Sequence, residues 1–237
     1  MQGMGLLGAA VANNASWCDA VCRGQGYPGT FSSRLWSSTR HRLRFYPNAI
    51  TLRPEVTAPE VLAAAAPCQP FAVKDSFARL DLAPAGFRLL AEASWIVRDG
   101  GPDGPPDDGL CWDKVTSPGE LADWETAWAG GSGDGPVFRP GLLSDPRCAI
   151  LACRQEDTII AGAIVYAAGR AAGISNLFGT GLPPDRLWAS IQQAVAGVQP
   201  HLPVVGYEEG ASLEAARQAG FRVLGPLRVW VRPSPAP

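Results

Sequence analysis

The sequence has few residues that bind metals and no long apolar segment. It contains only two histidines, His41 and His201, and no pair of its six cysteines has the CxxC spacing. Zinc sites need clustered ligands, so we expect no metal site. No apolar run reaches the roughly 18 residues that are needed to cross a bilayer, which argues against a membrane-spanning helix.

An excess of charge of one sign is also lacking. The formal net charge is −2, and lysine occurs only at Lys74 and Lys114. This balance creates no field that would attract nucleic acid or an anionic membrane, so we expect neither as a partner. Residues 1–12 are apolar without a basic segment before them, which disfavours a secretory signal. The even number of cysteines allows disulfides, but free thiols in a cytoplasmic protein are the simpler expectation.

Glycine and proline are abundant, and they gather between two halves of the chain. Residues 100–109 consist of Gly, Pro and Asp alone. These residues favour turns and interrupt helices and strands, so this segment is expected to be a linker. It divides the chain into a first domain, residues 1–99, and a second domain, residues 110–237.

The two halves end on similar sequences. Residues 85–98 align with residues 219–232 without gaps, and seven of the fourteen positions are identical. The same shift of 134 residues brings the apolar segment 71–73 onto 205–207. The match predicts an internal duplication, in which the first half is a partial copy that keeps a strand, a helix and a final strand. Chance agreement among the common residues Ala, Gly, Leu and Arg is the alternative.

The second half has a regular order of expected elements. Ser117 and Glu120 form a capping box that opens the first helix. Pro226 indicates a bulge or an edge position in the last strand. The expected strands are 112–115, 148–154, 159–167, 173–178, 203–207 and 221–231, and the expected helices are 118–128, 184–198 and 211–219. The fold class is therefore α/β (or α+β), with a mixed, mostly antiparallel sheet flanked by helices. In the first half, a helix at 15–23 would place Cys18 and Cys22 in the core.

This order of elements, together with residues 204–221, resembles the GNAT superfamily of N-acetyltransferases. The resemblance covers residues 112–232, and the first half is similar to the degenerate unit of tandem GNAT proteins. It implies an acyl donor, acetyl-CoA or another acyl-CoA, and transfer of the acyl group to the amine of a small molecule. The sequence does not settle the oligomeric state, although aromatic residues near the last strand could support a homodimer.

The resemblance assigns coenzyme A to the loop at residues 178–186. Gly179, Thr180, Gly181 and Arg186 stand where the family holds the pyrophosphate on backbone N–H groups. The leading Arg or Gln of the family pattern is absent, and Pro183 and Pro184 each remove a donor. On the preceding strand, Ser175, Asn176 and Leu177 would face the acyl group. The tyrosine that often serves as general acid is replaced by Ala216.

Acylation of an amine needs a base that removes a proton. Glu208 and Glu209 follow directly after a strand and are the best candidates, although they could instead complement the dipole of the next helix. Tyr207, beside them, is either a site hydroxyl or a core residue.

The first half offers candidates for binding the substrate. Lys74 and Asp75 occupy the place matched by Glu208 and Glu209, with a surface ion pair as the alternative. A basic cluster interleaved with aromatic residues suggests that Arg44 and Tyr46 bind a phosphate or carboxylate, with a solvated basic face as the alternative. This cluster contains Arg34, Arg40, His41, Arg42 and Arg44, with Trp36, Phe45 and Tyr46.

The sequence therefore predicts an acyl-CoA-dependent N-acyltransferase. A non-catalytic protein that binds a ligand or a partner is the first alternative, because the loop and the position of Ala216 depart from the family pattern. An enzyme with altered acyl-thioester chemistry is the second.

Overall fold

The computed structural model describes residues 5–38, 43–65, 70–100, 110–130 and 136–233. The first half contains α1 (Gly5–Gly24), β1 (Thr30–Phe31), β2 (Leu35–Ser37), β3 (Ala49–Thr51), α2 (Ala58–Ala65), β4 (Phe71–Asp75), the 3₁₀ helix η1 (Ala83–Ala85) and β5 (Arg88–Arg98). The second half contains β6 (Trp112–Lys114), α3 (Pro118–Ala129), the 3₁₀ helix η2 (Pro140–Ser144), β7 (Cys148–Gln155), β8 (Thr158–Ala168), β9 (Ala171–Gly179), α4 (Pro184–Val198), β10 (Val204–Glu208), α5 (Gly210–Gln218) and β11 (Arg222–Arg232).

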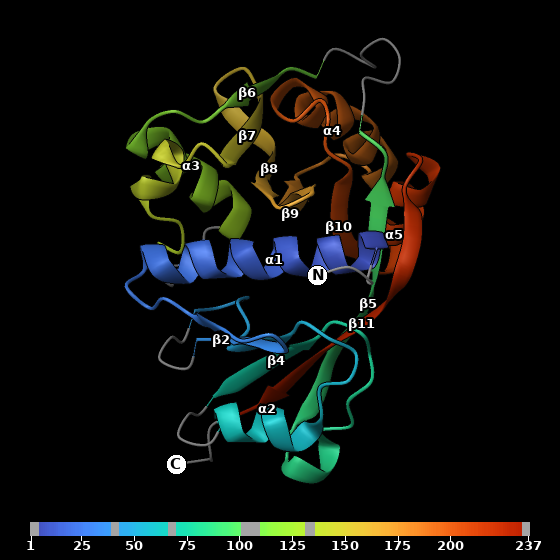
Figure 1. Ribbon diagram of the computed structural model, residues 1–237. Helices are drawn as coiled ribbons and strands as arrows, with labels where there is room; N and C mark the ends of the chain where they lie inside the picture. Colours follow the sequence, from blue (N-terminus) through green and yellow to red (C-terminus); the bar gives the residue numbers. More distant parts are fainter. Residues whose placement is uncertain (1–4, 39–42, 66–69, 101–109, 131–135, 234–237) are drawn as a thin grey trace.

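The strands form one sheet in the order β1-β2-β3-β4-β11-β5-β10-β9-β8-β7-β6. Neighbours run antiparallel except in the pairs β3–β4 and β9–β10. This confirms the predicted fold class, a mixed and mostly antiparallel sheet flanked by helices. In Figure 1, α1 crosses the middle of the molecule, between the strands of the second half and those around β4.

Alternation along the strands separates two cores on opposite faces of the sheet. Ile150 and Ala152 of β7 belong to the cluster that Trp17 of α1 and Trp124 of α3 complete. Leu151, between them in sequence, belongs to the cluster under α4 and α5. The helices of the second half therefore cover both faces, and α1 joins α3 on one of them.

Local signals predicted the second half well. The α4 helix spans the predicted residues, and Ser117 forms the capping box: its Oγ accepts from the Glu120 N–H at 3.2 Å, and Glu120 accepts from the Ser117 N–H at 3.0 Å. For Pro226 the expectation of a bulge holds, because the register shifts between Val223 and Gly225. The expectation of an edge is wrong, since β11 lies between β4 and β5.

The first half differs from the prediction in three ways. The helix predicted at 15–23 begins at Gly5. A meander of three short antiparallel strands, β1 to β3, precedes α2, so the early elements of the second half have counterparts here. The helix predicted between β4 and β5 is only the short η1. Strands of two or three residues are too short to show a period, which explains why the sequence did not reveal them.

The last strands of the two halves are exchanged. β5 pairs with β10, and β11 pairs with β4. The ladder between β5 and β11 maps onto itself under a shift of 134 residues: the pair Arg222–Val97 becomes Val231–Arg88, and Leu227–Ala93 is its centre. A duplication would produce this symmetry, and the duplication itself stays a prediction. In space, however, the boundary between residues 99 and 110 does not separate two sheets.

Asn13 fixes α1 against the sheet. Its Nδ2 donates to the carbonyls of Tyr166, at 2.8 Å, and Ala171, at 2.9 Å. A Cβ on Gly173 would lie 2.0 Å from Asn13 Oδ1, so only glycine lets the helix approach this closely. This contact determines where the middle of α1 lies relative to the ends of β9 and β10.

Candidate active site where β9 and β10 separate

The strands β9 and β10 pair over only two rungs. Val204 faces Ala172 and Val205 faces Gly173, and no further partners follow. Both strands nevertheless continue, β9 to Gly179 and β10 to Glu208. Their ends, where the two strands have separated, carry six of the predicted site residues: Ser175, Asn176, Leu177 and Gly179 on β9, and Tyr207 and Glu208 on β10.

A bulge lies on the β9 side of this separation. Ser175 pairs with Ile164 of β8 and Phe178 pairs with Gly162, so Asn176 and Leu177 together oppose one residue. Asn176 has φ 55°, a left-handed conformation that asparagine tolerates better than most residues. Such a bulge releases backbone groups from the ladder and redirects them. It stands within the segment predicted to face an acyl group.

The Asn176 side chain connects this bulge to the first half. The hydroxyl of buried Tyr46 donates to Asn176 Oδ1 at 3.3 Å. Burial raises the pKa of Tyr46 well above its ordinary value, so the phenol stays protonated. Two residues predicted for different roles, one in each half, are thus brought together.

Glu208 lies on the β10 side, half-buried, and turns toward α5. Burial raises the pKa of its carboxyl to about 7, the Ser212 hydroxyl lowers it through a hydrogen bond, and the charge of Glu209 raises it. Trp188 of α4 donates to the same Ser212 Oγ at 3.0 Å. A carboxyl whose pKa lies near neutrality can accept a proton and release it again under ordinary conditions.

The neighbours of Glu208 have different surroundings. Glu209 is exposed and is the N-cap residue of α5, without a capping hydrogen bond from its side chain. Tyr207 points to the opposite face, toward α1, because side chains alternate along β10. Its ring packs edge-on against Trp95, at 5.4 Å between centroids.

Lys74 lies beside Tyr207. Its side chain is buried at 3% exposure, its Nζ donates to Asn14 Oδ1 at 2.8 Å, and it lies 4.1 Å from the centroid of the Tyr207 ring. The alternative of a surface ion pair with Asp75 is therefore wrong. Asp75 is also buried, but it accepts the Leu80 N–H at 2.8 Å and closes the loop after β4. Burial raises the pKa of Asp75.

The register also corrects the predicted correspondence between the halves. Lys74 pairs with Val229, and Tyr207 pairs with Trp95, the residue 134 positions before Val229. Lys74 thus corresponds to Tyr207, and Asp75 to Glu208. The sequence match placed Phe71 on Val205. In the sheet, Phe71 pairs with Arg232 and Val204 pairs with the matching Arg98, so Phe71 corresponds to Val204, one residue earlier.

The predicted basic cluster does not act as a unit. Arg34 pairs with Glu60 of α2 at 2.7 Å, and Arg44 is exposed and lies over the ring of Phe45, 4.7 Å from its centroid. Arg40, His41 and Arg42 lie outside the described residues.

The loop after β9 offers few donors to a pyrophosphate. The Thr180 N–H is already bound to the Ile160 carbonyl at 2.7 Å, and Pro183 and Pro184 have no N–H. Gly181 has φ 73° with open space around it, and Arg186 is exposed in the first turn of α4. Asp185 adds a negative charge to that turn. Three positions of the predicted loop, Thr180, Pro183 and Pro184, therefore offer no backbone N–H to an anion.

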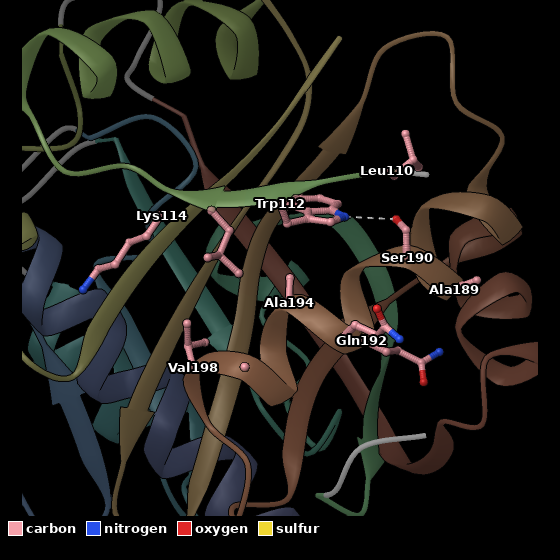
Figure 2. A pocket seen from close by; sticks show the side chains of 11 residues that line it. Leu110, Trp112, Lys114, Ala189, Ser190, Gln192, Ala194 and Val198 are labelled. Atoms are coloured by element: carbon pink, nitrogen blue, oxygen red, sulfur yellow. Dashed lines mark hydrogen bonds between the residues drawn. The ribbon is translucent and has the colours of Figure 1, made fainter. Parts of the chain in front are cut away.

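Two grooves lie elsewhere. One, of about 510 Å³, lies between β6 and α4, where Trp112 donates to Ser190 Oγ at 3.3 Å (Figure 2). The other, of about 560 Å³, lies between α1 and η2. None of the predicted site residues lines either groove. Among the described residues, no group of three His, Cys, Asp or Glu could hold a metal, no helix is long and apolar enough to cross a membrane, and the cysteines are free thiols.

The sequence did not predict a role in the site for Asn14, Ser212 or Trp188. Asn14 and Ser212 are polar residues on helices and give no signal of their partners, because those partners come from distant strands. The position of Asn14 on a helix face that is buried indicates that its side chain needs a hydrogen-bond partner, but the sequence does not show that this partner is Lys74.

Comparison with models of protein families and with curated proteins finds no match. Solved structures do match. A GCN5-related N-acetyltransferase from Kribbella flavida is 14% identical, with a TM-score of 0.66, and 98% of each chain is covered. A putative GNAT-family acetyltransferase from Novosphingobium aromaticivorans is 12% identical, with a TM-score of 0.57, over 95% of this chain and 99% of that one. The C-terminal domain of a putative lysylphosphatidylglycerol synthetase from Agrobacterium fabrum is 14% identical, with a TM-score of 0.51, over 96% and 92%. The chain therefore has the GNAT fold, and the likeness extends over both halves.

Proposed function

We propose that this protein is an N-acyltransferase that transfers an acyl group, acetyl in the first instance, from coenzyme A to the amine of a small molecule. The observation that carries the proposal is Glu208. It is a half-buried carboxyl with a pKa of about 7, at the point where β9 and β10 separate. The GNAT fold of the whole chain supports the same conclusion.

The residues on either side of the separation have complementary tasks. An acyl thioester supplies an activated carbonyl and a thiolate that leaves readily. Glu208, whose pKa lies near neutrality, accepts the proton of the incoming amine when it is ionised. Backbone N–H groups released by the bulge at Asn176 and Leu177 are suited to stabilise a developing oxyanion. Ala216 is buried and carries no hydroxyl, so the thiolate would be protonated by water.

The fit to coenzyme A differs between its two ends. The acyl end would lie near the carboxyl of Glu208, which can accept a proton, and near the bulge at Asn176 and Leu177, whose N–H groups can stabilise an oxyanion. The diphosphate end meets Gly181 and the first turn of α4, where the Thr180 N–H is occupied. We infer that the donor is held mainly through its acyl and pantetheine part.

A second candidate is a non-catalytic GNAT-like protein that binds a ligand. The hydrogen bond from Trp188 to Ser212 favours it, because this contact joins α4 to α5 beside Glu208. An acyl donor that binds between α4 and α5 would have to break this hydrogen bond.

Thermal unfolding with increasing acetyl-CoA tests donor binding. We expect the wild type to be stabilised, and Gly181→Val to weaken the effect only in part, because the loop holds the diphosphate end and the acyl and pantetheine part supplies most of the binding. Gly169→Val is the matched control, because Gly169 also has a positive φ, 63°, and open space around it, but lies in the turn between β8 and β9. No stabilisation of the wild type at millimolar acetyl-CoA would refute donor binding.

Release of free thiol from acetyl-CoA in the presence of a panel of amines tests turnover. We expect Glu208→Gln to abolish the release, while Glu209→Gln retains it because that side chain is exposed. Donor binding without thiol release for any amine would favour the second candidate. A cytoplasmic location and a homodimer stay predictions.

A further inference from the structure

Lys74 is a buried cation without a carboxylate partner. It is 3% exposed, and no ion pair joins it to Asp or Glu among the described residues. Its ammonium group has three donors, and its one hydrogen bond is to Asn14 Oδ1, at 2.8 Å. The Tyr207 ring, 4.1 Å away, adds a weak attraction. Charged side chains are rarely buried this deeply unless they are paired, so this arrangement lacks an anion.

A second unsatisfied group lies near Lys74. Ser76, two residues further along the chain, is fully buried, and its Oγ has no hydrogen-bond partner among the described residues. Trp95, which packs against Tyr207, donates to the Ser76 carbonyl at 2.8 Å. Trp95 therefore connects the backbone of buried Ser76 to the ring of Tyr207, beside which the ammonium of Lys74 has donors to spare.

The neighbourhood of the Tyr207 ring adjoins the proposed active site on its α1 side. Tyr207 belongs to the part of β10 that has separated from β9, and Glu208 follows it on the other face. The ammonium of Lys74 is close enough to Cys18 of α1 to oppose the rise in the pKa of that thiol caused by burial. Lys74 thus contacts Tyr207 on one face of β10, and Glu208, the next residue, projects from the other face.

We propose that Lys74 binds a carboxylate of the acceptor, so that the substrate class is an amine that also carries a carboxylate. The amine and the carboxylate are separated by several bonds, because Tyr207 and Glu208 point to opposite faces of the sheet. The identity of the anion as the acceptor's own rests on the proposed function, whereas binding of a carboxylate at Lys74 does not.

Binding of simple probes tests the inference without turnover. The probes are 6-aminohexanoate, hexanoate and hexylamine, titrated against the full chain by calorimetry in the absence of a donor. We expect both carboxylates to bind the wild type, and hexylamine to bind more weakly. Lys74→Met should weaken carboxylate binding by about 10- to 100-fold, the range for losing a hydrogen bond to a charged group. Lys114→Met, which changes the only other lysine of the chain, should leave it unchanged.

The stability of Lys74→Met against urea is a second measurement. A lysine that serves the fold would make this variant less stable than the wild type, whereas a lysine kept for binding would make it more stable. If Lys74 is kept for binding, Lys74→Met should unfold at higher urea than the wild type without probe, because an unpaired buried charge is replaced by an apolar chain of similar length. Lys74→Gln serves as a second neutral variant should the methionine variant not fold.

The inference is overturned if carboxylates do not bind the wild type, or if the neutral variants bind them equally well. Inorganic phosphate, added in competition with hexanoate, tests whether the site is selective for carboxylates. If it displaces hexanoate at equal concentration, the site takes any anion and the assignment to a carboxylate is wrong. If carboxylates bind through Lys74 but no amine is acylated, the inference stands and the proposed function fails. If amines are acylated and Lys74→Met changes neither carboxylate binding nor the KM for the amine, the proposed function stands and the inference fails.

Discussion

Replacing Glu208 with glutamine should stabilise the protein increasingly as the pH rises from 5 to 8. The unfolded chain releases this proton near pH 4.5 and the folded chain near pH 7. Between these values the folded state binds more protons, so the wild type loses stability as the pH rises through this window. Glutamine does not titrate, so the stability of the variant does not fall with pH through this group.

The magnitude follows from the two pKa values. Each tenfold change in proton affinity is worth about 1.4 kcal/mol. Raising the pKa of Glu208 from 4.5 to about 7 therefore lets the variant gain on the wild type by about 2–3 kcal/mol between pH 5 and pH 8. For a chain of this size, each kcal/mol moves the melting temperature by about 2–4 °C.

Urea unfolding followed by tryptophan fluorescence at pH 5, 6, 7 and 8 measures this difference. Glu209→Gln is the control, because Glu209 is exposed at the start of α5. Removing its charge lowers the pKa of Glu208 a little, so this variant should lose slightly less stability than the wild type and still titrate, unlike Glu208→Gln. The pH dependence of kcat/KM should rise through a pKa near 7 in the wild type, as expected for a base that must be ionised. Parallel stability curves for Glu208→Gln and the wild type would refute the raised pKa and remove the main support for a catalytic base.

Three further predictions concern the same part of the molecule. Ser212→Ala should raise the pKa of Glu208 further, since it removes a hydrogen bond to the ionised form, and the rising limb of the pH–rate profile should move to higher pH; an unmoved limb contradicts this. Gly173→Ala should cost about 2–4 kcal/mol in urea unfolding, because the new Cβ displaces Asn13 from the two carbonyls it bridges, and Gly197→Ala, on the open side of α4, should cost nothing. Residues 110–237 expressed alone should lack cooperative unfolding by circular dichroism, since β10 and β11 both lose β5; a sharp transition would contradict the exchange.

The sequence predicted those elements whose signal is local. The periodic apolar face of α4 and the Ser117 capping box are properties of consecutive residues, and both were found where expected. The same is true of the antiparallel meander β7 to β9, because its connections are too short for a crossover.

The sequence did not predict which strands pair across the two halves. The match between residues 85–98 and 219–232 predicts a final strand in each half, but both flanking neighbours of β5 and of β11 come from distant parts of the chain. A similar limit applies to the site. Lys74 was noted as one of two lysines, but its burial beside Tyr207 depends on the exchange and on the contact of Asn13 with the sheet.

The exchange of final strands also explains why the site draws on both halves. Because β5 and β11 lie side by side at the centre, β4 and β10 flank them symmetrically, and their equivalent residues Lys74 and Tyr207 approach each other below α1. The first half has only the short η1 between β4 and β5, where the second half has α5 between β10 and β11. It supplies Lys74, Asn14 and Tyr46, which lie beside the separating strands β9 and β10 of the second half. Residues of both halves therefore meet at this place, so neither half expressed alone should keep the arrangement.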